Sequence, residues 1–203
     1  MSQDLSPEFR MISDWIKPGS RVLDLGCGDG RLLGYLQDTR QVTGYGLEID
    51  QSNILRCVQN GINVIHTDLD EGLQDFDPDS FDYVVMTQTL QAVHYPDRLL
   101  EEMLRVGRQG IVTFPNFAHW RLRLHLALHG RMPMSSALPH AWYDTPNIHL
   151  CTVRDFEALC AERQIGILQR SVTTAYFQES LTARLMPNLF ASVALYRFEK
   201  LKR

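Results

Sequence analysis

Residues 22–30 read VLDLGCGDG, an apolar run that ends in a carboxylate and is followed by glycine at every second position. Gly26, Gly28 and Gly30 carry no side chain, which costs conformational entropy unless the backbone needs positive φ or must lie against another group. The stretch therefore predicts a buried strand that ends in a tight turn. At such a turn, main-chain N–H groups approach a ligand with no Cβ in the way.

Strand and helix patterns alternate on both sides of this turn, and short apolar runs are followed by segments with apolar residues three and four apart. That alternation predicts an α/β fold, namely a doubly wound, mostly parallel seven-stranded sheet of the Rossmann-like type. The last two β-like runs are expected to form an antiparallel hairpin at the sheet edge. The predicted strands are 21–25, 41–49, 63–68, 83–86, 110–114, 165–174 and 192–200, and the predicted helices are 30–37, 51–60, 96–106, 116–131 and 153–164.

Length and pattern predict one domain over residues 1–203, without repeats or an internal linker. Within it we expect an N-terminal helix and turn at 1–20 and a ligand-binding half at 21–115. An insertion at 116–150 is expected to serve as a lid or a partner surface. The C-terminal helix and edge strands occupy 151–203.

The composition excludes several classes of function. With 44% hydrophobic residues, 22% charged residues and a net charge of −4, the chain shows no electrostatic case for nucleic acid or an anionic membrane. No apolar run approaches the roughly 20 residues that cross a bilayer, and the first residues are acidic where a signal peptide is basic. The four cysteines form no C-x-x-C pair, so we expect reduced thiols and a cytoplasmic protein.

Two further acids stand at predicted strand ends. Glu48 ends the second strand about 20 residues after the glycines, where a nucleotide's ribose hydroxyls are held in doubly wound sheets. A carboxylate has two oxygens and accepts hydrogen bonds from both vicinal hydroxyls. Asp68 ends the third strand, where it is placed to accept from an exocyclic amine such as that of adenine. A glycine turn followed by two acids is far more specific than glycines alone.

The spacing of the glycines argues against the other common nucleotide-binding motifs. In a dinucleotide G-x-G-x-x-G fingerprint starting at Gly26, the third glycine position falls on Arg31, and no phosphate-cradling G-x-x-x-x-G-K-[ST] occurs. DLGCGDG (24–30), YGLEID (45–50) and TDL (67–69) instead resemble three successive motifs of class I S-adenosylmethionine-dependent methyltransferases. The resemblance implies that S-adenosylmethionine or S-adenosylhomocysteine binds here. The implied binding residues are Asp24, Gly26, Cys27, Gly28, Glu48, Ile49, Asp68, Leu69, Thr87 and Gln88.

Catalytic residues are not identified by the sequence, since methyl transfer is an in-line displacement that positioning alone can promote. A general base is needed only where the acceptor loses a proton. His94 and Tyr95 follow the fourth strand and are candidates to face an acceptor, although loop residues at such places are more often ordinary. His125 and His129 lie four apart without a third ligand, so no metal site is expected.

The second half carries a separate resemblance. Residues 104–133 (LRVGRQGIVTFPNFAHWRLRLHLALHGRMP) and 138–160 (LPHAWYDTPNIHLCTVRDFEALC) closely resemble the MetW family of bacterial methionine-biosynthesis proteins. That resemblance implies a methyltransferase-like fold that accompanies a homoserine O-acyltransferase and supports its activity. The aromatic side chains of Trp120, Trp142 and Tyr143 are expected to pack partly onto the core as a lid, because large aromatics bury much area.

Three functional hypotheses remain in order of preference. The first is an activating or regulatory partner of homoserine O-acyltransferase that keeps a cofactor pocket. The second is a methyltransferase acting on an unidentified small molecule, and whether the chain is an enzyme stays open between these two. A dinucleotide-dependent oxidoreductase is a distant third, because the third glycine is missing.

Overall fold

The computed structural model describes residues 6–174, 178 and 180–201, and its strands form a single mixed sheet. The strands are β1 (Arg21–Leu25), β2 (Thr43–Glu48), β3 (Val64–His66), β4 (Phe81–Thr87), β5 (Gly107–Pro115), β6 (Ile165–Thr173) and β7 (Val193–Lys200). Their order across the sheet is β3-β2-β1-β4-β5-β7-β6. Strands β1 to β5 pair in parallel, whereas β7 is antiparallel to both β5 and β6. The predicted doubly wound sheet with an antiparallel edge hairpin is confirmed.

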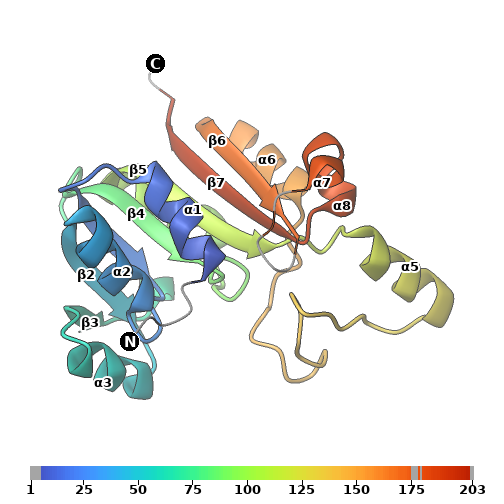
Figure 1. Cartoon of the computed structure of the whole chain (residues 1–203), viewed down its shortest axis with the longest axis horizontal. Helices are drawn as coiled ribbons and strands as arrows, with labels where there is room; N and C mark the ends of the chain where they lie inside the picture. The colour runs from blue at the N-terminus through green and yellow to red at the C-terminus, as the bar shows by residue number, and fades with distance from the viewer. Residues whose placement is uncertain (1–5, 175–177, 179, 202–203) are drawn as a thin grey trace.

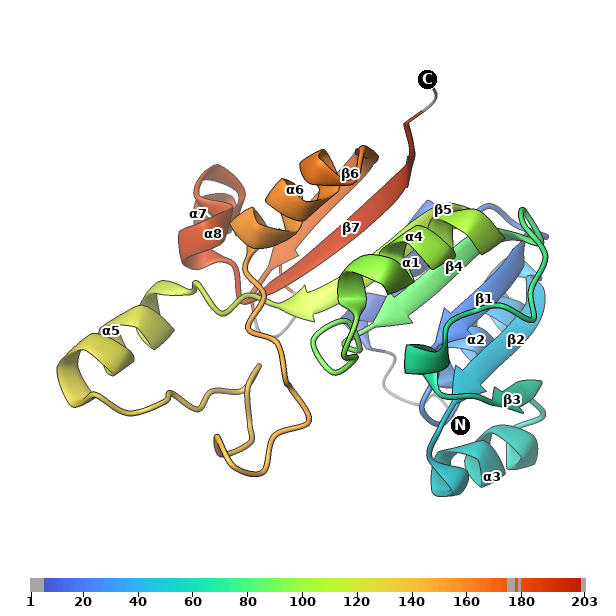
Figure 2. The same ribbon diagram turned by 180° about the vertical axis from the view of Figure 1, so that it is seen from behind.

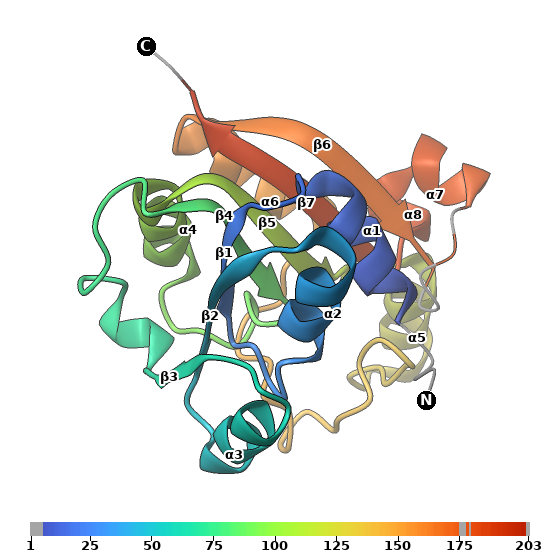
Figure 3. The ribbon, with the colours of Figure 1, turned by 60° about the vertical axis from the view of Figure 1, so that its left-hand side comes forward.

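Helices cover both faces of this sheet (Figure 1). The helices of the described residues are α1 (Pro7–Trp15), α2 (Arg31–Arg40), α3 (Gln51–Gln59), the 3₁₀ turn η1 (Leu69–Glu71), α4 (Pro96–Val106), α5 (Trp120–His129), α6 (Val153–Glu162), α7 (Leu181–Leu185) and α8 (Pro187–Phe190). Figure 3 shows β3 and α3 at one edge of the sheet and β6 with β7 at the opposite edge. The expected division of 1–203 into functional parts stays a prediction.

Side-chain alternation along the strands separates the core into two layers, because successive residues point to opposite faces of a sheet. Val22 packs in the layer under α1 and α2, and its neighbour Leu23 packs in the layer under α4 and α6. The same alternation places Ile111 in the first layer and Val112 in the second. Figure 2 shows α4 and α6 on the face opposite to the one that α1 and α2 cover in Figure 1. Both faces of the sheet are therefore buried under helices, as is typical of a parallel sheet.

Helix α6 shows how the sequence determines local structure in the second half. The hydroxyl of Thr152 accepts a hydrogen bond from the N–H of Asp155 at 3.2 Å and donates to the Asp155 carboxylate, which caps the first turn of the helix. Phe156 is buried and its ring centroid lies 4.6 Å from that of Tyr196 on β7. The cap begins the helix and the aromatic contact fixes its inner face on the sheet.

Two segments keep large apolar side chains exposed. Ile54, Leu55 and Val58 lie on one side of α3, where Leu55 and Val58 are 63% and 64% exposed, so this apolar side faces solvent and the inward residue is Cys57. Trp142 and Tyr143 are 75% and 77% exposed, so these two rings do not pack onto the core as a lid. The reason is visible in Figures 1 and 2, where α5 and the loop after it extend away from the sheet.

Candidate functional site

The glycine turn has the backbone conformation that its sequence implies. Gly26, Gly28 and Gly30 have φ of +67°, +57° and +78°, a left-handed region that glycine adopts without strain. At Gly26, an added Cβ would lie 2.7 Å from the hydroxyl oxygen of Thr89. At Gly28, an added Cβ would meet no atom within 4 Å. The first glycine is therefore needed for packing, and the second leaves its backbone open on one side.

Backbone hydrogen bonds tie this turn to the end of β2. The N–H groups of Gly26 and Cys27 both donate to the carbonyl of Leu47, at 2.9 and 3.0 Å. The N–H of Gly28 donates to Oε2 of Glu48 at 2.8 Å. The turn therefore lies at the point where the strand order reverses between β1 and β4, which is where open α/β sheets bind ligands.

Glu48 is the acceptor at the centre of this arrangement. Its carboxylate is buried, and its Oε1 accepts from the N–H groups of Ile49 and Asp50, both at 2.9 Å. Together with Gly28, three backbone donors therefore fill three of the roughly four acceptor positions of a carboxylate. One position remains for a ligand hydroxyl, and a second hydroxyl would have to take the place of the Gly28 N–H.

Asp24 is a buried carboxylate that lacks the hydrogen bonds a buried carboxylate normally accepts. Neither of its oxygens has a hydrogen-bond partner among the described residues, although the side chain is 1% exposed. Burial, together with the nearby charges of Glu48 and Glu8, raises the pKa of Asp24 to about 7. A buried acid without a partner is costly, so a donor or a cation that reaches it is strongly favoured.

Glu8 belongs to the same end of the sheet and was missed from the sequence. It lies on α1, where its Oε1 accepts from the hydroxyl of Thr113 on β5 at 2.6 Å and from Nε2 of Gln88 at 3.4 Å. Burial raises the pKa of Glu8, and these two hydrogen bonds oppose the rise. No motif marks Glu8, because only the tertiary position of α1 brings it to the strand ends.

The end of β4 contributes the polar residues expected there. Gln88 has a positive φ of +53°. Its backbone N–H donates to two atoms of Thr113, the carbonyl oxygen at 3.0 Å and the hydroxyl oxygen at 3.1 Å. Thr87 is half-buried, and its carbonyl accepts from the hydroxyl of Thr89 at 2.9 Å. Gln88 thus joins α1, β4 and β5 beside the glycine turn.

The residues implied for the adenine end lie on two successive loops. Ile49 follows Glu48 directly and its side chain is 56% exposed, so it offers an apolar surface beside the carboxylate. Asp68 caps η1, where its Oδ1 accepts from the N–H of Asp70 at 3.0 Å. Leu69 packs partly against the core.

Cys27 does not offer its side chain to this edge. Its sulfur lies 3.8 Å from that of Cys57 on α3, and the thiol fills the space left by Gly46. Burial raises the pKa of the Cys27 thiol, which keeps it protonated. What Cys27 presents at the turn is therefore its backbone.

The histidines are arranged differently from one another. Nδ1 of His94 lies 2.6 Å from Oδ2 of Asp70, and the backbone N–H of His94 donates to Oδ1 of the same carboxylate at 2.8 Å. His125 and His129 stack on α5 with ring centroids 4.5 Å apart. Among the described residues, no group of three or more His, Cys, Asp or Glu side chains is placed to hold a metal ion.

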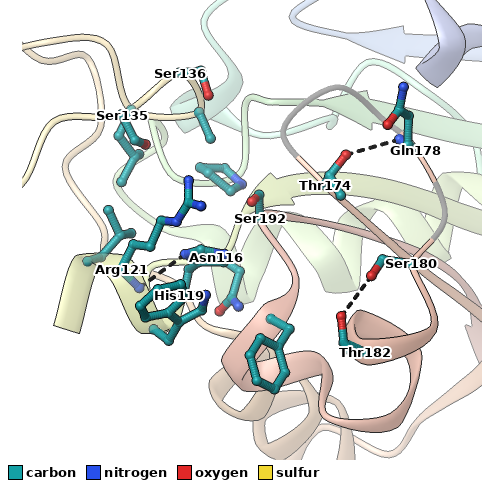
Figure 4. A pocket seen from close by; sticks show the side chains of 16 residues that line it. Asn116, His119, Arg121, Ser135, Ser136, Thr174, Gln178, Ser180, Thr182 and Ser192 are labelled. Carbon is teal, nitrogen blue, oxygen red and sulfur yellow. Dashed lines mark hydrogen bonds between the residues drawn. The ribbon is translucent and has the colours of Figure 1, made fainter. Parts of the chain in front are cut away.

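A cavity of about 420 Å³ lies beyond the carboxyl end of β5, between α5, the loop after it and the turn before α7. Figure 4 shows Arg121 and several hydroxyl side chains around it. The side chain of the nearby Asn116 already makes hydrogen bonds within the protein. Its amide nitrogen donates to the carbonyl of Ala191, and its amide oxygen accepts from the N–H of Ala118. This cavity contains no residue of the glycine turn, so the two sites are separate places on one edge of the sheet.

The insertion that forms this cavity also reaches the β4–α4 loop. The N–H groups of Ile148 and His149 both donate to the carbonyl of Gln91, at 2.9 and 3.0 Å. Gln91 is buried, and its Nε2 donates to the carbonyl of Gln88 at 2.7 Å. A short hydrogen-bonded chain therefore links the insertion to the residue beside the glycine turn.

Comparison with known families decides where the chain belongs. Residues 6–198 match the family model described as methionine biosynthesis protein MetW. The chain belongs to the MetW family. A relative within this family, the bifunctional methionine biosynthesis protein MetXA/MetW of Rhodopirellula baltica, is 38% identical over 208 residues, covering 98% of this chain and 33% of that protein. The chain thus spans about a third of the length of the first curated relatives it matches.

Solved structures share the fold of this MetW chain. An S-adenosylmethionine-dependent methyltransferase from Mesorhizobium loti superposes with a TM-score of 0.70 at 17% identity, over 97% of this chain and 99% of that one. A methyltransferase of the same cofactor class from Archaeoglobus fulgidus gives 0.68 at 16% identity, over 96% and 92%. At these identities the likeness shows the fold alone. No helix in the described part of the chain is long and apolar enough to span a membrane.

Proposed function

We propose that this chain binds S-adenosylmethionine or S-adenosylhomocysteine at the glycine turn and acts as an activating or regulatory partner of homoserine O-acyltransferase in methionine biosynthesis. The proposed binding of the cofactor, called the cofactor half below, rests on the geometry of the glycine turn. The proposed partner role, called the partner half, rests on the fused MetXA/MetW relative. The two halves are tested separately below.

Asp24 carries the cofactor half. S-adenosylmethionine brings an ammonium group, and the buried Asp24 carboxylate without a partner fits such a cation. The open backbone at Gly28 fits a ligand that lies against the turn, and the remaining acceptor position of Glu48 fits a ribose hydroxyl. Ile49 would pack against the adenine and Asp68 would accept from its amine. When bound, the cofactor supplies an electrophilic methyl group on sulfur.

The remaining implied residues complete the pocket in the same proposal. Thr87 and Gln88 would line the methionyl end, and Gly26 and Cys27 would contribute their backbone. Leu69 would close the adenine end beside Asp68. Glu8 is added to this set because it lies beside Gln88 and raises the pKa of Asp24.

The single observation that carries the partner half is the fused relative. In Rhodopirellula baltica a segment 38% identical to this chain forms a third of a protein whose name joins MetXA to MetW. Two functions that are joined in one chain in one organism are often served by associating chains in another. We infer that the separate chain binds the homoserine O-acyltransferase that the remainder of the fused protein represents.

Co-purification and rate measurements test this role. The tagged chain and the acyltransferase of the same organism are expected to elute together in size-exclusion chromatography, and the acyltransferase rate is expected to rise when the chain is added. A regulatory pocket also requires that S-adenosylmethionine binds the complex and the free chain with different affinity. Separate elution together with an unchanged acyltransferase rate would contradict the partner role and leave the cofactor site standing.

A second candidate function is a methyltransferase acting on a small molecule. The observation that favours it is the pair of His94 and Asp70, in which a carboxylate holds one ring nitrogen and leaves Nε2 as a proton acceptor. Incubation with labelled S-adenosylmethionine and metabolites that contain hydroxyl or amino groups tests it. Transfer that is lost in His94→Gln supports an enzyme, and no transfer to any acceptor counts against it.

A further inference from the structure

We propose that the outer face of α5, formed by Trp120, Leu124 and Leu128, is the surface that binds the partner. We further propose that this partner presents an apolar groove with an acidic rim. The proposal rests on the partner role proposed above and adds where on this chain the contact is made.

The sequence of α5 makes a helix with two opposite apolar faces. Residues Trp120–His129 read WRLRLHLALH, in which every second residue from Trp120 to Leu128 is a large apolar one. On a helix with about 3.6 residues per turn, Trp120, Leu124 and Leu128 lie above one another, and Leu122 lies on roughly the opposite side. Leu122 is buried, whereas Trp120, Leu124 and Leu128 are 38%, 48% and 70% exposed. Leu126 lies beside Leu122 and is 47% exposed, so only the Leu122 end of that face is used within the fold, whereas the side formed by Trp120, Leu124 and Leu128 faces solvent.

Besides Leu122, the side chain of Arg123 holds this helix by donating to the carbonyls of Ala118 and of Asn188 on α8. Figures 1 and 2 show α5 extending from the end of β5, away from the sheet. Leu122 is its one buried residue. An isolated helix of about ten residues is marginal in water, and most helices are stabilised by packing of their apolar face. Three large exposed side chains spaced four apart are the pattern by which a helix inserts into a hydrophobic groove.

The charges around this face indicate what the groove must carry. No Asp or Glu occurs between Glu102 and Asp144 in the sequence. Arg121, Arg123 and Arg131 make no ion pair with any carboxylate among the described residues, although arginines elsewhere in the fold do. The Arg121 guanidinium lies 5.4 Å from the centre of the Trp120 ring, and both residues also line the cavity beyond β5. Arg123 already donates to the carbonyls of Ala118 and Asn188, so Arg121 and Arg131 are the arginines beside the apolar side chains that fit carboxylates on a partner.

These charges argue against a second copy of this chain as the occupant. A symmetric pair of α5 helices would bring both sets of arginines together with no acid between them, and like charges at an interface are costly. The fused relative supplies the alternative, because there the MetW segment and its companion are held together in one polypeptide. We therefore assign the outer face of α5 to the acyltransferase partner.

The test measures binding of the full-length chain to the purified homoserine O-acyltransferase by biolayer interferometry. Leu124→Glu/Leu128→Glu places two charges on the proposed face and is expected to weaken binding at least about tenfold. The matched control is Leu55→Glu/Val58→Glu on α3, which changes two equally exposed apolar residues elsewhere and is expected to bind like the unchanged chain. Arg121→Glu is expected to weaken binding and to reduce its dependence on salt.

Each outcome has a distinct meaning. If the unchanged chain binds and the Leu124/Leu128 variant binds equally well, with the same circular dichroism spectrum, the assignment of the surface is wrong and the partner role stands. If the unchanged chain does not bind the acyltransferase, the partner role itself fails. Sedimentation that shows a dimer of the unchanged chain, converted to a monomer by Leu124→Glu/Leu128→Glu, overturns the choice of occupant.

Discussion

The backbone N–H of Gly28 donates to Oε2 of Glu48 at 2.8 Å, and this contact joins the glycine turn after β1 to the end of β2. The same carboxylate also holds the first two N–H groups of the β2–α3 connection. The two loops that would surround a cofactor are thus fixed relative to each other by one buried side chain. A site prepared in this way loses little conformational freedom when a ligand binds.

We expect Gly28→Val to abolish binding of S-adenosylmethionine. The new side chain has space in the protein, because a Cβ at this position meets no atom within 4 Å, and it would occupy the space proposed for the ligand. The φ of +57° adds strain of about 1–2 kcal/mol to the folded state. Gly19→Val is the matched control, since Gly19 has φ of +73° and equally open surroundings but lies before β1.

Calorimetric titration of both variants measures this effect. Weakened binding in Gly28→Val alone, with similar losses of stability in the two variants, supports the site. Normal affinity in Gly28→Val would show that the cofactor binds elsewhere.

The pKa of Asp24 predicts how stability varies with pH in the absence of ligand. In the folded protein this carboxyl keeps its proton up to about pH 7, whereas in the unfolded chain it loses the proton near its ordinary value of 3.8. The folded state therefore binds the extra proton between these values, and the free energy of unfolding falls as pH rises from about 4 to 7. The contribution is on the order of 4 kcal/mol at most.

Urea unfolding of the unchanged chain and of Asp24→Asn at several pH values isolates this contribution. The difference in unfolding free energy between the two proteins is expected to change steadily over that pH range, with the unchanged chain losing stability relative to the variant. A difference that stays constant with pH would mean that Asp24 ionises normally in the folded protein.

Thr113 and Glu8 are expected to stabilise each other. Thr113→Val removes the 2.6 Å hydrogen bond to the buried Glu8 carboxylate while keeping the shape of the side chain. Leaving that acceptor with one long bond to Gln88 is expected to lower the unfolding free energy by about 1–3 kcal/mol. A double-mutant cycle with Glu8→Gln measures the coupling, which is expected at about 0.5–3 kcal/mol. A coupling of zero would show that the hydrogen bond between Thr113 and Glu8 contributes nothing to stability.

Much of the fold follows from local sequence signals. Strand β4 is predicted by its continuous apolar run, because a strand buried on both faces lacks polar positions. The three glycines were correctly read as a turn, since each adopts positive φ. The N-caps of Asp50 and Thr152 also follow from residue type alone. These features depend on neighbours in the chain, which a sequence displays.

Features that depend on distant elements escaped prediction. Glu8 joins the site only because α1 lies over the ends of β4 and β5, 80 to 105 residues away in the chain. The outward side of α3 looks like a core face in the sequence, because periodicity shows that residues share a side and not what that side meets. Trp142 was expected to be buried on the ground of its size, and the course of the insertion keeps it exposed.

A titration of S-adenosylmethionine into the chain at pH 6 and pH 8 tests the central claim most directly. The ammonium of the ligand requires an ionised Asp24, so the dissociation constant is expected to be several-fold lower at pH 8, with proton uptake by the buffer at pH 6. Asp24→Asn is expected to weaken binding and remove the difference between the two pH values. No binding of S-adenosylmethionine at either pH, or tighter binding of NAD, would contradict the assignment of the glycine turn.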